Sequence, residues 1–161
     1  MTTTAMTTAT LTIRRPVTVL LLLVMTILII LITVRTAGKS YSNLEPVPFE
    51  EVRNLWRHIE HKPVGTHIVA LILVPIIANV FLFVPWAFLL FLSLYTDSRP
   101  TVQTYVLTIL LGLTFTCTIE AWQYFLPSRV ADVNDVIWNS VGVLAGAILG
   151  HLRARVRFEF E

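Results

Sequence analysis

The apolar positions of this chain fall into four long runs separated by polar stretches. The hydrocarbon core of a bilayer is about 30 Å thick, so a helix that crosses it needs roughly 20 apolar residues in succession. Each run is long enough, since the four cover residues 17–34, 68–94, 102–125 and 133–152. The pattern therefore predicts an all-α integral membrane protein, a four-helix bundle within residues 14–152.

Composition agrees with this prediction. Of the 161 residues, 55% are hydrophobic and 14% are charged, and the mean hydropathy is +0.75; soluble domains are far more polar. The Thr-rich residues 1–13 bury little and are expected to be disordered. Residues 153–161 are expected to form a cytoplasmic tail. The first run exceeds the roughly 7–15 residues of a signal-peptide core and precedes no small-residue cleavage motif, so we interpret it as a retained anchor.

Several classes of chemistry find no support in the sequence. Cys117 is the only cysteine, so no intramolecular disulfide can form. His58 and His61 alone are too little for a metal site, and no phosphate loop or nucleophile motif is present. We therefore expect no metal and no cofactor. The basic residues lie at the ends of the runs, which argues against nucleic acid as a partner.

Lys and Arg set the orientation of a membrane protein. With the N-terminus inside, the 12 Lys and Arg residues divide evenly between the two faces. The basic clusters flanking the first and last runs are dense, whereas the loop at 35–66 mixes its positive charges with four glutamates. We therefore expect a multi-pass protein of the cell membrane with both termini in the cytoplasm. The polar stretch at 120–139 then opens toward the outside.

The loop between the first two runs has a helical pattern of its own. From Phe49 onward, Val52, Trp56 and Ile59 share one face, and charged residues lie opposite. This predicts a short extracytoplasmic amphipathic helix. It could lie on the outer leaflet or cover the end of the bundle.

Small and polar residues share one face on each of the last two runs. On the fourth run this face carries Asp132, Asp135, Asn139, Gly142, Gly146 and Gly150, and on the third run it carries Gly112, Thr116, Glu120 and Gln123. Small residues let helices approach closely, so we predict that these two runs pack face to face as a hairpin. The polar residues would then converge below the outer surface, with Arg129 in the turn to neutralise the carboxylates. The three glycines could instead form a homodimer contact.

Each polar residue also has a structural interpretation. Asp132 suits an N-cap and Asp135 a favourable position near a helix N-terminus, while Gln123 and Asn139 could join helices by hydrogen bonds. An acidic residue inside a membrane span points to function, which makes Glu120 the leading candidate. Asn79 lies between two prolines of the second run, where its amide could satisfy a freed backbone carbonyl or belong to the site.

These residues also resemble a family. The run NVFLFVPWAFLL from Asn79, E-x-x-Q at Glu120 and R-x-x-D-x-x-D-x-x-x-N from Arg129 are similar to VanZ-like membrane proteins, as is NLEPVPF from Asn43. The resemblance implies a four-helix bacterial membrane protein and, from the named member, low-level resistance to the glycopeptide teicoplanin. Two positions depart from the family pattern. Ala87 stands where a glycine is usual, and Asn134 where an acidic residue is frequent.

Three functions remain open at this stage. The site formed by Glu120, Gln123, Arg129, Asp132, Asp135, Asn139 and Asn79 could bind a membrane lipid, a lipid-linked wall precursor or the glycopeptide itself. It could instead modify an envelope lipid or glycan, with Glu120 or Asp135 as general base. A small transporter is the third alternative, although no inverted repeat is evident.

Overall fold

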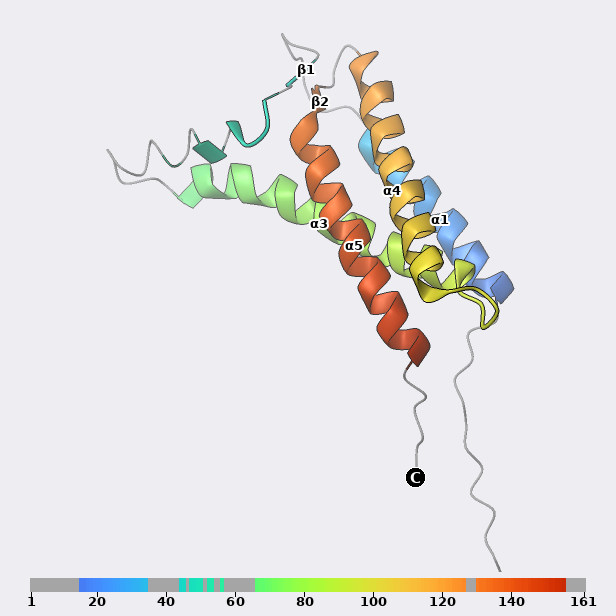
Figure 1. Ribbon diagram of the computed structural model, residues 1–161. Coiled ribbons are helices and arrows are strands. Elements are labelled where there is room, and N and C mark those ends of the chain that lie inside the picture. Colours follow the sequence, from blue (N-terminus) through green and yellow to red (C-terminus); the bar gives the residue numbers. More distant parts are fainter. Residues whose placement is uncertain are drawn as a thin grey trace, which may run out of the picture.

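Four helices form the protein in the computed structural model, which describes residues 15–34, 44–45, 47–50, 52–53, 56, 66–126 and 130–155 (Figure 1). These helices are α1 (Arg15–Val34), α3 (Thr66–Leu94), α4 (Thr101–Tyr124) and α5 (Val133–Arg155). Each is long and apolar enough to cross a membrane. The predicted all-α class is thereby confirmed, and the four helices coincide with the four predicted apolar runs.

A short backbone pairing fastens the segment after α1 to the bundle. The two-residue strands β1 (Leu44–Glu45) and β2 (Ala131–Asp132) run parallel, with Leu44 opposite Ala131 and Glu45 opposite Asp132. Of the predicted amphipathic helix, residues 50, 52–53 and 56 are helical and Phe49 lies in the turn just before them, while its remaining residues lie outside the described part of the chain. The segment after β1 therefore begins beside the start of α5.

The glycine face of α5 packs against α3, which corrects the predicted arrangement. A Cβ atom placed on Gly142 would lie 2.6 Å from the backbone oxygen of Val80, and one on Gly150 would lie 2.9 Å from Cβ of Phe91. Gly146 abuts the backbone of Val84 and the side chain of Ala87 in the same way. Our prediction that this glycine face meets α4 is wrong. Because these three glycines have no side chains, the backbone of α3 can approach α5 there instead.

The α4 helix meets α5 along a different line. A Cβ atom on Gly112 would lie 2.6 Å from a methyl group of Val143. The branched side chain of Val143 on α5 therefore packs directly against Gly112 of α4. The predicted hairpin therefore exists, but it turns the α5 glycines away from α4. A homodimer through Gly142, Gly146 and Gly150 stays a prediction, and it would require α3 to leave this face.

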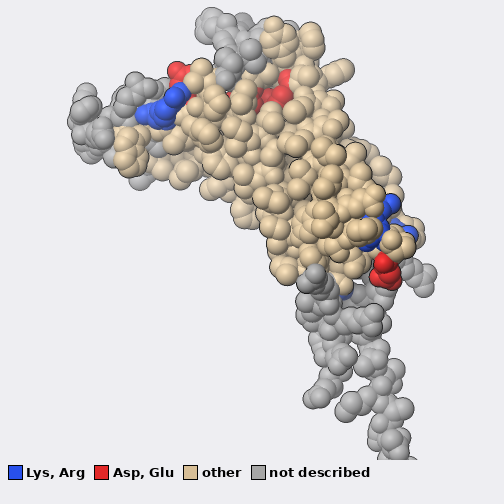
Figure 2. Space-filling model, in the orientation of Figure 1, with Lys and Arg blue, Asp and Glu red and all other residues tan. Residues whose placement is uncertain are grey.

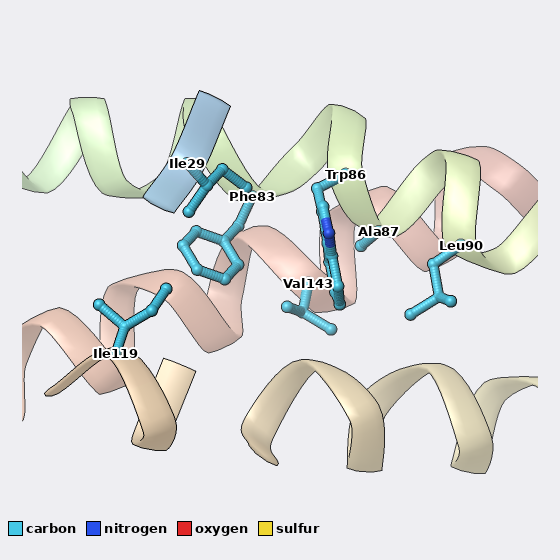
Figure 3. Packing of buried hydrophobic residues seen from close by; sticks show 7 residues of the cluster. All are labelled: Ile29, Phe83, Trp86, Ala87, Leu90, Ile119 and Val143. Atoms are coloured by element: carbon cyan, nitrogen blue, oxygen red, sulfur yellow. The ribbon is translucent and has the colours of Figure 1, made fainter. Parts of the chain in front are cut away.

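The apolar core lies where all four helices come together. Its buried members are Ile29, Phe83, Trp86, Ala87, Leu90, Ile119 and Val143 (Figure 3). Phe115 stacks on Trp86 with ring centroids 4.9 Å apart. The indole Nε1 of Trp86 donates a hydrogen bond of 2.9 Å to the hydroxyl of Thr26, which secures α1 to α3.

One end of the bundle gathers three helix ends. Figure 1 shows the end of α1, the end of α4 and the beginning of α5 close together near the top of the view, while the first turns of α3 project to the left. We call this the site end, because it contains the polar residues predicted to converge. At the opposite end, the hydroxyl of Tyr105 on α4 hydrogen-bonds to Nδ1 of His151 on α5 over 2.8 Å.

Candidate functional site

Glu120 links the last turns of α4 to the beginning of α5. Its side chain is 7% exposed, and its Oε2 atom accepts a hydrogen bond of 2.9 Å from the backbone N–H of Asp132. The α4 helix ends soon afterwards, where the backbone N–H of Phe125 bonds to the carbonyl of Trp122. A carboxylate from one span therefore holds the backbone that starts the next.

Asp132 caps α5, as predicted. Its Oδ1 atom accepts a hydrogen bond of 2.7 Å from the backbone N–H of Asn134, and N-terminal N–H groups have no partner within their own helix. Because the Asp132 backbone donates to Glu120 while its side chain accepts from Asn134, the residue serves the cap and the site together.

Asn134 is a site residue that sequence analysis did not include. It is 8% exposed, and its Oδ1 atom accepts a hydrogen bond of 2.7 Å from the backbone N–H of Phe49. The Phe49 ring meets Trp138 of α5 edge to face, with centroids 6.1 Å apart, and its φ of 59° lies in the left-handed region. The departure from the family pattern at Asn134 was the available signal. A neutral amide here fastens the segment after β1 over the start of α5.

Asn79 brings α3 into the site. Its Nδ2 atom donates a hydrogen bond of 2.5 Å to Oδ1 of Asp135 on α5. The Asn79 amide therefore bonds to another helix. Of the two interpretations of this residue, the one in which it belongs to the site holds, and the one in which it bonds to a carbonyl of its own helix does not. The helix continues past both Pro75 and Pro85. Asp135 lies in the first turn of α5, so this contact ties that turn to the middle of α3.

Asn139 lies one turn deeper than Asp135 on the same helix. It is 3% exposed, and its Nδ2 atom donates a hydrogen bond of 2.8 Å to Oγ1 of Thr116 on α4. Its Oδ1 atom is buried and has no hydrogen-bond partner among the described residues. Such atoms are uncommon in folded proteins. The Oδ1 atom of Asn139 is therefore a buried hydrogen-bond acceptor on the inner side of the polar group.

Gln123 extends the polar group to α1. The side chain is 4% exposed, and Nε2 donates a hydrogen bond of 3.2 Å to the backbone oxygen of Thr33. That oxygen belongs to the last turns of α1, whose carbonyl groups have no partner further along the helix. All four helices thus contribute a contact to the site end.

The predicted convergence can be followed residue by residue. Asn79, Glu120, Gln123, Asp132, Asp135 and Asn139 all bond between segments at the site end or cap α5 there, whereas Arg129 lies outside the described residues. Figure 2 shows acidic atoms near the top of the molecule surrounded by uncharged ones. The described part of the chain holds no group of three His, Cys, Asp or Glu side chains placed for a metal ion.

The chemistry of the group follows from its atoms. Carboxylate and amide oxygens accept hydrogen bonds from hydroxyl, amide and ammonium groups, and a carboxylate can also take up or release a proton. Glu120, Asp135 and Asn79 come from three different helices, and hydrogen bonds hold each of them. Little reorganisation would be needed for these atoms to meet a ligand.

A comparison with known proteins bears on these residues. Residues 17–154 match the model of a protein family described as VanZ/LLP1, a range that includes nearly all of the four helices and every site residue. No curated protein and no solved structure matches the chain.

Proposed function

The chain belongs to the VanZ/LLP1 family, and from that premise we propose that it binds a cell-envelope lipid or lipid-linked precursor at the outer face of a bacterial cytoplasmic membrane. Binding at the site end lowers susceptibility to glycopeptides of the teicoplanin type. The ligand contacts are the side chains of Glu120, Asp135 and Asn139, with Asn79 and Gln123 holding neighbouring helices in place. Arg129 meets an anionic group of the ligand.

The observation that supports this proposal is the bonded group of polar side chains from three spans. Asn79 of α3 meets Asp135 of α5, and Glu120 of α4 meets the backbone of Asp132. Polar groups in hydrocarbon are costly unless they are paired or used. Helix association alone needs few such contacts, because small residues already bring α3 and α5 together. The accumulation of acceptors at one end therefore favours recognition of a donor-rich head group.

The test compares two carboxylates at opposite ends of the bundle. Glu120→Gln keeps an oxygen that can accept from the N–H of Asp132 but removes the charge. Asp97→Asn makes the same change on an exposed residue beyond α3. We expect expression of the chain to raise the teicoplanin concentration that inhibits a susceptible host, Glu120→Gln to abolish the increase, and Asp97→Asn to preserve it.

A susceptibility that stays the same with and without the chain would contradict the proposed phenotype. Protein levels in the membrane fraction must be equal for the three chains, so that loss of folding is not mistaken for loss of binding. Binding of the lipid-linked precursor to the purified chain in vesicles, with Arg129→Ala as a further variant, tests recognition directly.

Orientation needs its own measurement. A cysteine at Ser98, in the exposed turn between α3 and α4, would be labelled only from the cytoplasm, and one at Ser128 only from outside, in a chain whose Cys117 is replaced. Labelling of position 98 from outside would reverse the proposed face.

A second candidate is a membrane enzyme that modifies an envelope lipid or glycan. The two carboxylates differ in surroundings, because Glu120 is buried and Asp135 is half-buried, and unequal environments let two carboxyl groups divide acid and base roles. Lipid and muropeptide profiles of cells with and without the chain decide the matter. A new product that disappears in Glu120→Gln supports catalysis, and identical profiles reject it.

A further inference from the structure

An apolar groove runs between α1 and α4 beside the polar group. Its volume is about 360 Å³, and it is lined by Ile30, Thr33, Phe115, Thr118, Ile119 and Trp122. Sites for small molecules span roughly 300–1,000 Å³, so the groove has room for part of a ligand. α1 and α4 touch each other little elsewhere, which leaves the groove open at its side.

The groove lies inside the membrane-spanning segments and near the site end. Its residues belong to the last turns of the spans Arg15–Thr33 and Thr101–Tyr124. Trp122 on its wall is 62% exposed, and Tyr124 and Phe125 next along α4 are also exposed. Aromatic residues gather where a bilayer meets water. The groove therefore starts just below that level and continues into the hydrocarbon.

The two threonines on the wall present methyl groups, since their hydroxyl groups are already used. The hydroxyl of Thr33 donates to the backbone oxygen of Ile29 at 2.7 Å, and that of Thr118 donates to the backbone oxygen of Thr114 at 2.7 Å. The other four lining side chains are apolar or aromatic. An occupant of this groove would meet hydrocarbon surface almost everywhere.

The groove and the polar group share one wall. Ile119 and Trp122 face the groove, whereas their sequence neighbours Glu120 and Gln123 belong to the polar group. The bond from Gln123 to the backbone of Thr33 crosses from α4 to α1 at this level. A molecule with an apolar chain in the groove would therefore carry its polar part toward Glu120 and Gln123.

We propose that the groove between α1 and α4 holds one hydrocarbon chain of a membrane lipid, which enters sideways from the bilayer and presents its head group to the polar residues of the site end. This assignment rests on the proposed function for the head group but not for the chain. The occupant is a lipid chain because the groove opens within the spans, has a methyl and aromatic lining, and adjoins the polar residues of the site end.

The test maps where a lipid chain touches the protein. The full chain is placed in vesicles of phosphatidylethanolamine and phosphatidylglycerol that contain a little phosphatidylglycerol with a photoreactive diazirine in one acyl chain. After irradiation and digestion, mass spectrometry locates the adducts. We expect several-fold more adducts on the groove residues than on Leu110 and Leu111, which are exposed on the same helix.

A pair of matched variants sharpens the test. Thr118→Phe fills the groove, whereas Thr114→Phe makes the same change one turn earlier on α4, at an exposed threonine that also bonds to its own helix and does not line the groove. Adducts in the groove should fall several-fold in Thr118→Phe and stay unchanged in Thr114→Phe. Even labelling along α4, or equal effects of both variants, would overturn the proposal.

A second copy of the chain is the competing occupant. In a Cys117→Ser chain, Thr118→Cys would form disulfide-linked dimers rapidly in the same vesicles if α4 of another molecule filled the groove, and that result would also overturn the proposal. Glu120→Gln separates the two inferences. If Glu120→Gln keeps full resistance while the groove is still labelled, the proposed function is rejected and the groove assignment stands. If Glu120→Gln loses resistance while labelling is even along α4, the groove assignment is rejected and the proposed function stands.

Discussion

The first and last spans reverse the relation usual in soluble proteins, in which the more apolar helix is the more buried one. α1 is the most apolar of the four spans and α5 the least apolar, yet 11% of an 18-residue stretch of α1 is buried against 39% of such a stretch of α5. Lipid tails are as apolar as leucine, so a leucine-rich helix gains little by leaving them. Glycine, polar side chains and close backbone contact decide burial here. Hydropathy therefore locates the spans, whereas glycine and polar side chains determine which helix is buried among the others.

The largest expected effect comes from filling the glycine contact. Gly146→Leu would push the new side chain into the backbone of Val84 and the side chain of Ala87, and overpacking costs about 1–3 kcal/mol or more. Unfolding in increasing denaturing detergent should show the loss of stability. Leu149→Ile, on the exposed side of the same helix, should unfold like the parent chain. Equal stability of both variants would contradict the inference that close contact between α3 and α5 stabilises the fold.

A smaller effect is expected from the bond between α3 and α5 at the site. Asn79→Ala removes the donor to Asp135, and interhelical hydrogen bonds in membranes contribute about 1–2 kcal/mol in model peptides. The same detergent unfolding measures it. A double-mutant cycle with Asp135→Ala, which removes the acceptor, should give a coupling of similar size, and purely additive losses would mean that the two residues do not stabilise each other.

The smallest effect is expected on α1. Thr26→Val keeps the shape of the side chain but leaves Nε1 of Trp86 without its acceptor, which should cost about 0.6 kcal/mol by measured averages for such bonds. Proteolysis of the chain in vesicles, or cysteine labelling at Ile29, would report looser docking of α1. Leu31→Ala, on a residue that is 62% exposed, should change nothing measurable. A larger loss from Leu31→Ala would contradict the comparison between the first and last spans.

Part of the site could be predicted from sequence because its signals are local. The cap at Asp132 follows from residue type and position, and its bond to Asn134 confirms it. The convergence of Glu120 with the start of α5 followed from a short turn between two spans. Each of these depends on neighbours within one or two helical turns or one connection.

Other contacts depend on which helices become neighbours, and the pattern along one helix does not say which. A helical wheel placed the α5 glycines on one face but could not identify α3 as the helix that covers them. For the same reason, the acceptor of Gln123 on α1 and the bond from Phe49 to Asn134 were missed. In both of these bonds one partner is a backbone group, which every residue possesses and no motif marks.

Four long apolar helices, the all-α class, the family pattern and the residues of the candidate polar site could all be predicted from the amino-acid sequence. These follow from the length of apolar runs against the thickness of a bilayer and from the cost of polar groups within it. The packing of α3 on α5, the bond between Asn79 and Asp135 and the groove between α1 and α4 became known from the folded structure. Those outcomes depend on the fit of whole helix surfaces, where the absence of one side chain permits backbone contact and its presence prevents it.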